Sequence, residues 1–126
     1  MKILYIEDNA EMAYLVCAFL KGHGYDVEHF ALGGLGYDKF AADPASWDAV
    51  IIDLELPDTD GQHLIPKIAA QRPELPIVVY SGREGLKDSL ELYTSGAAAL
   101  LSKPCGGQDL LDVLKGLIDM PPAPIT

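Results

Sequence analysis

Short apolar runs alternate regularly with longer segments of helical periodicity along this chain, and this alternation is its strongest constraint on the fold. The apolar runs cover residues 2–6, 25–30, 48–53, 75–80 and 97–101. The helical segments cover 10–22, about 31–41, a stretch that includes 64–69, about 83–93, and a stretch that includes 110–118. Strands that alternate with helices favour a parallel sheet covered by helices on both faces.

The chain has 126 residues, of which 49% are hydrophobic, and this is enough for one domain with a proper core. At this size the alternation predicts an α/β fold: a doubly wound five-stranded parallel sheet with strand order 2-1-3-4-5 and five helices. We expect the domain to span residues 1–120. The proline-rich segment 121–126 is expected to be a tail or the start of a linker.

The charge balance is acidic, with 9 Lys plus Arg against 19 Asp plus Glu and a formal net charge of −10. This argues against a general nucleic-acid binder, which needs clustered cations, and it suits a bound cation or a basic partner. The first apolar run stops at Glu7 and Asp8, so it cannot form the core of a signal peptide. Because no apolar stretch approaches the ~20 residues of a membrane span, we expect a cytoplasmic location and no membrane contact.

Polar side chains follow four of the five predicted strands. Glu7 and Asp8 follow the first run, Asp53 the third, Ser81 the fourth and Lys103 the fifth. Ligands of such sheets bind beyond the carboxyl ends of the strands, and these four strands are neighbours in the predicted order. The sequence therefore places the polar groups together at one edge of the sheet.

Three carboxylates at one edge repel each other unless a cation joins them. Magnesium resolves the conflict because it prefers a few carboxylates and water as ligands. A lysine opposite the acids attracts phosphate, and a hydroxyl adds a hydrogen-bond donor. This combination has what the transfer of a phosphoryl group to a carboxylate requires.

The same residues resemble the receiver domain of two-component response regulators, over essentially the whole chain. The matching features, in order, are Glu7-Asp8, Asp53, Pro57 and Gly61, Ser81, and Lys103-Pro104. The resemblance implies the flavodoxin-like and CheY-like version of the fold. It also implies a phosphorylation switch that assists its own phosphorylation and slow dephosphorylation and is not an enzyme with a separate substrate.

The resemblance implies a role for each acid of the site. Asp53 would be the phosphoacceptor. Asp8 and Asp53 would bind Mg²⁺ together with the backbone carbonyl of Glu55, and Glu7 would act on the metal through water.

Two further roles concern the phosphoryl group. Ser81 would move to hydrogen-bond it, and Lys103 would form an ion pair with it. A cis peptide is expected between Lys103 and Pro104, as in similar domains.

The resemblance also implies partners. The phosphoryl donor would be a histidine kinase or a phosphotransfer protein. A downstream effector would bind the face formed by the fourth helix, fifth strand and fifth helix, and a homodimer is possible. The domain itself would not bind nucleic acid.

Four residues depart from the family pattern. Ser81 stands where Thr is commoner, which preserves the hydroxyl donor. Leu100 stands three positions before Lys103, where an aromatic switch residue is usual, so the common coupling through a turning ring is in doubt. Glu55 adds an acid beside the site, and we hypothesise that it sets the lifetime of the aspartyl phosphate. Cys105 replaces a bulkier side chain, which predicts different local packing.

Two other functions compete with the switch. A degenerate receiver would serve as a phosphorylation-independent protein-docking module because of Leu100. An aspartate-dependent phosphatase of the haloacid dehalogenase type would need a second Asp two residues after Asp53, where this chain has Glu55. Ser81 also has a purely structural alternative, because it could cap a helix that begins near Arg83.

Overall fold

The computed structural model describes residues 1–86, 89–103 and 106–118. It contains a five-stranded parallel sheet in the order β2-β1-β3-β4-β5, which confirms the predicted fold class. The strands are β1 (Lys2–Ile6), β2 (Asp26–Phe30), β3 (Ala49–Ile52), β4 (Ile77–Ser81) and β5 (Ala99–Ser102). The helices are α1 (Ala10–Gly22), α2 (Gly33–Ala42), α3 (Leu64–Gln71), α4 (Leu90–Ser95) and α5 (Gly107–Ile118).

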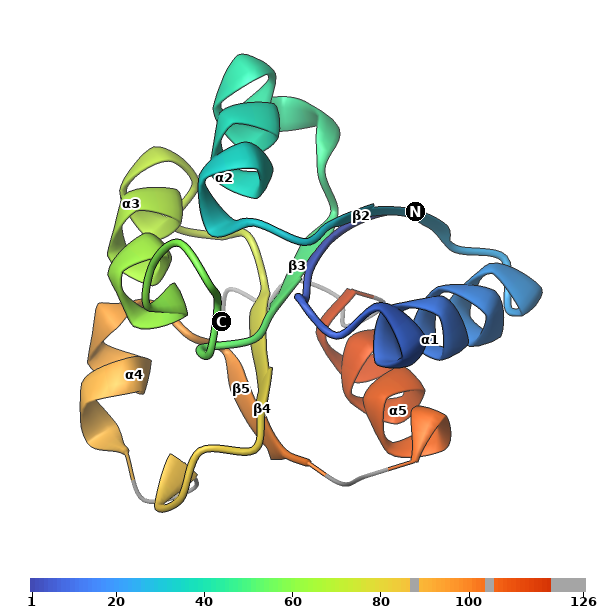
Figure 1. Cartoon of the computed structure of the whole chain (residues 1–126). Coiled ribbons are helices and arrows are strands. Elements are labelled where there is room, and N and C mark those ends of the chain that lie inside the picture. Colours follow the sequence, from blue (N-terminus) through green and yellow to red (C-terminus); the bar gives the residue numbers. More distant parts are fainter. Residues whose placement is uncertain (87–88, 104–105, 119–126) are drawn as a thin grey trace, which may run out of the picture.

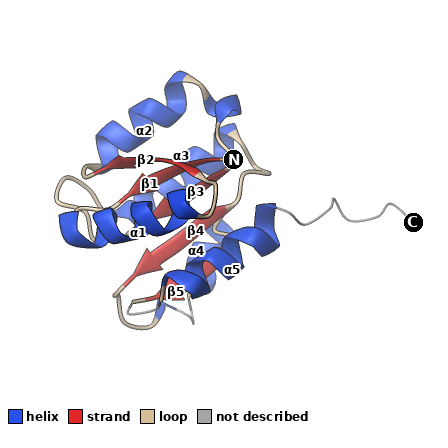
Figure 2. Ribbon diagram, turned by 90° about the vertical axis from the view of Figure 1, so that its right-hand side faces the viewer, coloured by secondary structure: helices blue, strands red, loops and turns tan. Residues whose placement is uncertain are grey.

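The helices form two layers around the sheet. Helices α2, α3 and α4 lie on one side of it, and α1 and α5 lie on the other (Figure 1). The view in Figure 2 shows α1 and α5 in front of the strands. No helix in the described ranges is long and apolar enough to span a membrane.

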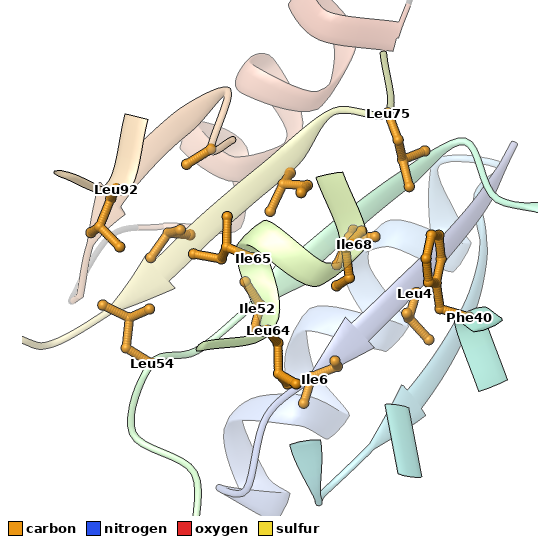
Figure 3. Close-up of a cluster of buried hydrophobic side chains, with 14 of the residues drawn as sticks. Leu4, Ile6, Phe40, Ile52, Leu54, Leu64, Ile65, Ile68, Leu75 and Leu92 are labelled. Carbon is orange, nitrogen blue, oxygen red and sulfur yellow. The ribbon is translucent and has the colours of Figure 1, made fainter. Parts of the chain in front are cut away.

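The core is divided in two by the sheet, because successive side chains of a strand point to opposite faces. On β1, Leu4 and Ile6 belong to the cluster under α2, α3 and α4, whereas Ile3 and Tyr5 belong to the cluster under α1 and α5. Figure 3 shows the first cluster, where Ile65 and Ile68 of α3 pack against the strands. Burial on both faces explains why β1, β3 and β4 read as continuous apolar runs, whereas the edge strand β2 carries polar side chains as well.

The fourth helix begins later than the sequence predicts. The apolar spacing favours a helix from about residue 83, but α4 begins at Leu90, where the Ser89 hydroxyl accepts a hydrogen bond from the Leu92 amide at 3.4 Å. Gly85 has a φ of +72°, a backbone conformation that does not fit a right-handed helix. The predicted tail 121–126 lies outside the described residues.

Candidate functional site

The ends of β1 and β3 bring three carboxylates together. Ile6 and Ile52 are register partners in the parallel sheet, so the residues that follow them emerge side by side. The Asp53 amide donates to the Ile6 carbonyl at 3.0 Å. Carboxylate oxygens of Glu7, Asp8 and Asp53 lie within 4.8 Å of one another. Glu7 and Asp53 are buried, and Asp8 is exposed.

Lys103 reaches these acids from the end of β5. Its backbone amide donates to the Ser81 carbonyl at 2.9 Å, which fixes it beside β4. Its Nζ lies 2.9 Å from Asp53 Oδ2 and also forms an ion pair with Glu7 Oε1. The Lys103 side chain is 17% exposed, that of Asp53 6% and that of Glu7 1%, so these ion pairs are shielded from water.

Burial and charge act differently on the two buried acids. Burial raises the pKa of Glu7, and the neighbouring Asp53 adds to this effect. Burial also opposes the charge of Asp53, but hydrogen bonds from Lys103 and from the Glu55 amide outweigh it and hold the pKa of Asp53 below its ordinary value. Asp53 is therefore the more acidic of the two buried carboxyl groups.

The acids fit a magnesium ion. Oxygen ligands at about 2.1 Å from Mg²⁺ are separated by about 3 Å when adjacent and about 4.2 Å when opposite. The carboxylate oxygens of this cluster lie within 4.8 Å of one another, so a modest approach of the side chains would bring them to these distances. Hard carboxylate oxygens, an exposed Asp8 open to water and a net negative charge also suit this ion. The chain would hold Mg²⁺ through Asp8 and Asp53, and Lys103 already compensates part of the charge of Glu7 and Asp53.

Ser81 is fully buried at the end of β4, between β3 and β5 in the sheet. Its hydroxyl accepts a hydrogen bond from the Arg83 amide at 3.3 Å. No helix begins at Arg83, so Ser81 is not the helix cap that the sequence left open.

The loop after β3 brings Glu55 beside the site. The Glu55 amide donates to Asp53 Oδ1 at 3.1 Å, while the Glu55 carboxylate turns toward Arg83. Gly61 closes the loop tightly, because a Cβ atom there would lie 2.3 Å from the Asp53 carbonyl oxygen. This contact gives a physical reason for glycine at that position.

Several residues contact the site that the sequence did not single out. The Tyr5 hydroxyl donates to Glu7 Oε1 at 3.4 Å, and the Tyr80 ring lies 5.3 Å from Lys103 Nζ. His29, at the end of β2, lies with Nε2 2.7 Å from the Glu7 carbonyl oxygen. The alternation of side chains along β1 could have placed Tyr5 on the same face as Glu7, but nothing in the sequence signals the roles of His29 or Arg83.

The departures from the family pattern have different outcomes. Leu100 is 8% exposed and packs in the core cluster under α2, α3 and α4. A leucine there fills the core and offers neither a ring nor a hydroxyl to the site. The predicted cis peptide before Pro104 and the packing of Cys105 fall outside the described residues.

Comparisons with known proteins agree with this geometry. Residues 3–115 match the family described as the response regulator receiver domain. The chain is 29% identical over 118 residues to the transcriptional regulatory protein CssR of Bacillus subtilis, a match that covers 94% of this chain and 51% of CssR. It is 30% identical to the virulence transcriptional regulatory protein PhoP of Salmonella typhimurium, covering 94% and 52% respectively. The chain thus spans about half the length of these relatives.

A solved structure matches the same family in its fold. A CheY-like response regulator receiver domain protein from Methanospirillum hungatei superimposes with a TM-score of 0.87 at 29% identity. The match covers 94% of this chain and 93% of that one.

Proposed function

We propose that this chain, which belongs to the response regulator receiver domain family, accepts a phosphoryl group on Asp53 in a Mg²⁺-dependent manner. Two-component signalling is the setting of its family, and the donor would be a histidine kinase or a phosphotransfer protein. The observation that carries the proposal is a buried Asp53 that lies 2.9 Å from Lys103 Nζ and close to the carboxylates of Glu7 and Asp8.

The residues of the site suit the chemistry of this transfer. An Asp53 oxygen would attack phosphorus while the bond from phosphorus to the donor's imidazole nitrogen breaks, and the imidazole would leave with that electron pair and take up a proton. Lys103 would then exchange part of its contact with Glu7 and Asp53 for the phosphoryl oxygens, since an ammonium binds phosphate as a point charge. Ser81 would move so that its hydroxyl donates a hydrogen bond to another of these oxygens.

The metal would supply positive charge that offsets the charge of the phosphoryl group. Asp8, Asp53 and the Glu55 carbonyl would hold it, and Glu7 would bind it through water. The short distance between the Glu55 amide and Asp53 Oδ1 supports this set, because it keeps the Glu55 backbone beside the acids.

The output of the switch would pass through the face formed by α4, β5 and α5, which could bind an effector or a second copy of the chain. The exposure of two large apolar side chains on α4 supports this proposal: Leu90 is 77% exposed and Tyr93 45%. Because the domain would act on its own aspartate and on no separate substrate, we do not class it as an enzyme. The cytoplasm, where histidine kinases supply phosphoryl groups, is the location that fits.

Mass spectrometry after incubation with acetyl phosphate and MgCl₂ tests the proposal. We expect the mass of one phosphoryl group to be added to the wild type and to Asp58→Asn, but not to Asp53→Asn or to protein without Mg²⁺. The adduct should be stable in acid and labile in alkali. A wild type that gains no mass would instead support the phosphorylation-independent docking module.

A further inference from the structure

Arg83 lies between two segments that border the site. Its guanidinium contacts three side chains of the segment after β3: Nε lies 2.9 Å from Glu55 Oε1, Nη2 lies 3.1 Å from Asp60 Oδ2, and Nη1 lies 3.4 Å from Gln62 Oε1. Its backbone amide donates to the Ser81 hydroxyl at 3.3 Å. Arg83 therefore links the end of β4 to the loop that follows Asp53.

The contacts close this loop at its base. Glu55 stands at its beginning, Asp60 and Gln62 stand at its end, and Glu55 forms an isolated antiparallel bridge with Asp60. Three different nitrogens of one planar guanidinium reach these acceptors, a geometry that the single ammonium of a lysine cannot reproduce. The side chain of Arg83 is 29% exposed, so solvent only partly weakens the network.

The position of this loop matters for magnesium. The Glu55 carbonyl is a proposed ligand, and the Glu55 amide already donates to Asp53 Oδ1. Mg²⁺ requires nearly ideal octahedral geometry, so a carbonyl ligand on a loose loop would bind it poorly. Groups outside the ligand shell that orient the ligands commonly change metal affinity by about 10–100-fold.

We propose that Arg83 is a positioning residue for magnesium binding. Arg83 connects the loop of residues 55–62 with the end of β4. It thereby keeps the Glu55 carbonyl beside the acids before the metal binds. This inference rests on the proposed function, because it assumes that Mg²⁺ binds there.

A purely electrostatic role of Arg83 predicts the opposite change in Mg²⁺ affinity when the residue is replaced. Removing a positive charge close to an acidic site strengthens the attraction of that site for a cation. If charge alone mattered, Arg83→Gln would bind Mg²⁺ more tightly and Arg83→Lys would resemble the wild type. If Arg83 acts by positioning the loop, both variants bind Mg²⁺ more weakly, since neither lysine nor glutamine can contact the three acceptors at once as the guanidinium does.

The experiment compares the wild type, Arg83→Lys, Arg83→Gln and the control Lys115→Gln, which removes the same charge from the exposed face of α5. Calorimetric titration with MgCl₂ measures affinity, and hydrogen exchange in metal-free protein measures the stability of the loop. We expect about a tenfold loss of Mg²⁺ affinity in both Arg83 variants. The Glu55 and Gly61 amides should exchange about fivefold faster, the scale of a partly exposed charge network.

A third measurement separates positioning from a general structural defect. In acetyl phosphate reactions, the Mg²⁺ concentration that gives half the maximal rate should rise in both Arg83 variants. The rate at saturating Mg²⁺ should stay within about twofold of the wild type, because the bound metal itself then holds the loop.

Tighter or unchanged Mg²⁺ binding in Arg83→Gln, or wild-type behaviour of Arg83→Lys, would overturn the inference. A wild type that takes up neither Mg²⁺ nor a phosphoryl group would overturn the proposed function itself. A wild type that takes up both, with unaffected Arg83 variants, would overturn only the role of Arg83.

Discussion

Truncation of Lys103 to alanine should be strongly destabilising in the absence of metal. At 2.9 Å and an effective dielectric constant of about 20, the attraction between Lys103 and Asp53 amounts to about 6 kcal/mol before desolvation is subtracted. Removal of one partner of a buried ion pair leaves the other charge uncompensated and typically costs about 3–5 kcal/mol. In Lys103→Ala, Glu7 and Asp53 would both lose their cation, so we expect a loss of this size at pH 7. For a domain of this length, the melting temperature should fall by about 10–20 °C.

The loss of stability in Lys103→Ala should depend on pH in one definite direction. Burial and Asp53 already raise the pKa of Glu7 in the folded wild type, and without Lys103 that pKa rises further. An acid whose folded pKa exceeds its unfolded value of about 4.3 stabilises the fold below that value, and the contribution is lost as the pH rises through the folded pKa. The deficit of Lys103→Ala should therefore shrink between pH 7 and pH 5. In the wild type the pKa of Lys103 is raised, so its contribution is complete at both pH values and is lost only in alkali.

Urea unfolding provides the assay, because Trp47 is the single tryptophan, is 1% exposed and reports unfolding by its fluorescence. Lys39→Ala is the matched control: its Nζ lies 3.9 Å from Glu28, but the side chain is 49% exposed, so a loss below about 1 kcal/mol is expected. Mg²⁺ should restore stability to Lys103→Ala, by about 1.4 kcal/mol at ten times its dissociation constant. A deficit below about 1 kcal/mol at pH 7, or one that does not change with pH, would refute the reasoning.

Two further predictions concern the loop after β3. In Glu55→Gln the lifetime of the aspartyl phosphate should change by about threefold or more, because the charge of Glu55 beside the site perturbs the attack of water; equal decay rates in wild type and variant, with Glu84→Gln as the control, would reject this role. Gly61→Ala should destabilise the fold by about 1–3 kcal/mol, since the new Cβ would meet the Asp53 carbonyl oxygen at 2.3 Å, and should also weaken Mg²⁺ binding. Gly116→Ala on α5, where a Cβ meets nothing within 4 Å, should instead stabilise the fold by about 0.5–1 kcal/mol in the same urea assay.

The sequence predicts the fold and the meeting of the central acids because both depend on the sheet. Apolar runs that are buried on both faces define the central strands β1, β3 and β4, and the parallel order fixes which strand ends are neighbours. Once Ile6 and Ile52 are register partners, Glu7 and Asp53 must emerge together. The position of Lys103 follows from the same rule, since β5 ends beside β4. The lysine side chain is long enough for its Nζ to reach Asp53.

Contacts made by loops do not follow from this rule. The carboxylate of Asp58 accepts hydrogen bonds from the Gly33 and Gly34 amides, both at 2.9 Å, and thus caps α2 from a loop 24 or 25 residues away. The sequence shows an acid and two glycines but no periodicity that would pair them. The late start of α4 does not follow from this rule either, since the apolar spacing does not reveal the positive φ of Gly85, and the helix begins only at Leu90.

Arg83 is a loop residue whose contacts the sequence does not predict but which bears on the proposed function. Its position two residues after β4 places its backbone at the site, but its long side chain could point to solvent, to Asp60 or to the acids themselves. Only the path of the loop from Glu55 to Gln62 selects the partners that it contacts. The residues expected to do the chemistry stand at the ends of strands, so the spacing predicts that they meet, and the resemblance to receiver domains implies their roles. Arg83 and Glu55, which we propose to adjust metal affinity and phosphoryl lifetime, stand on loops, where a small change of sequence alters the partners and leaves the sheet intact. We therefore expect receivers that share the strand-end residues to differ in how long they hold the phosphoryl group, according to the residues of these loops.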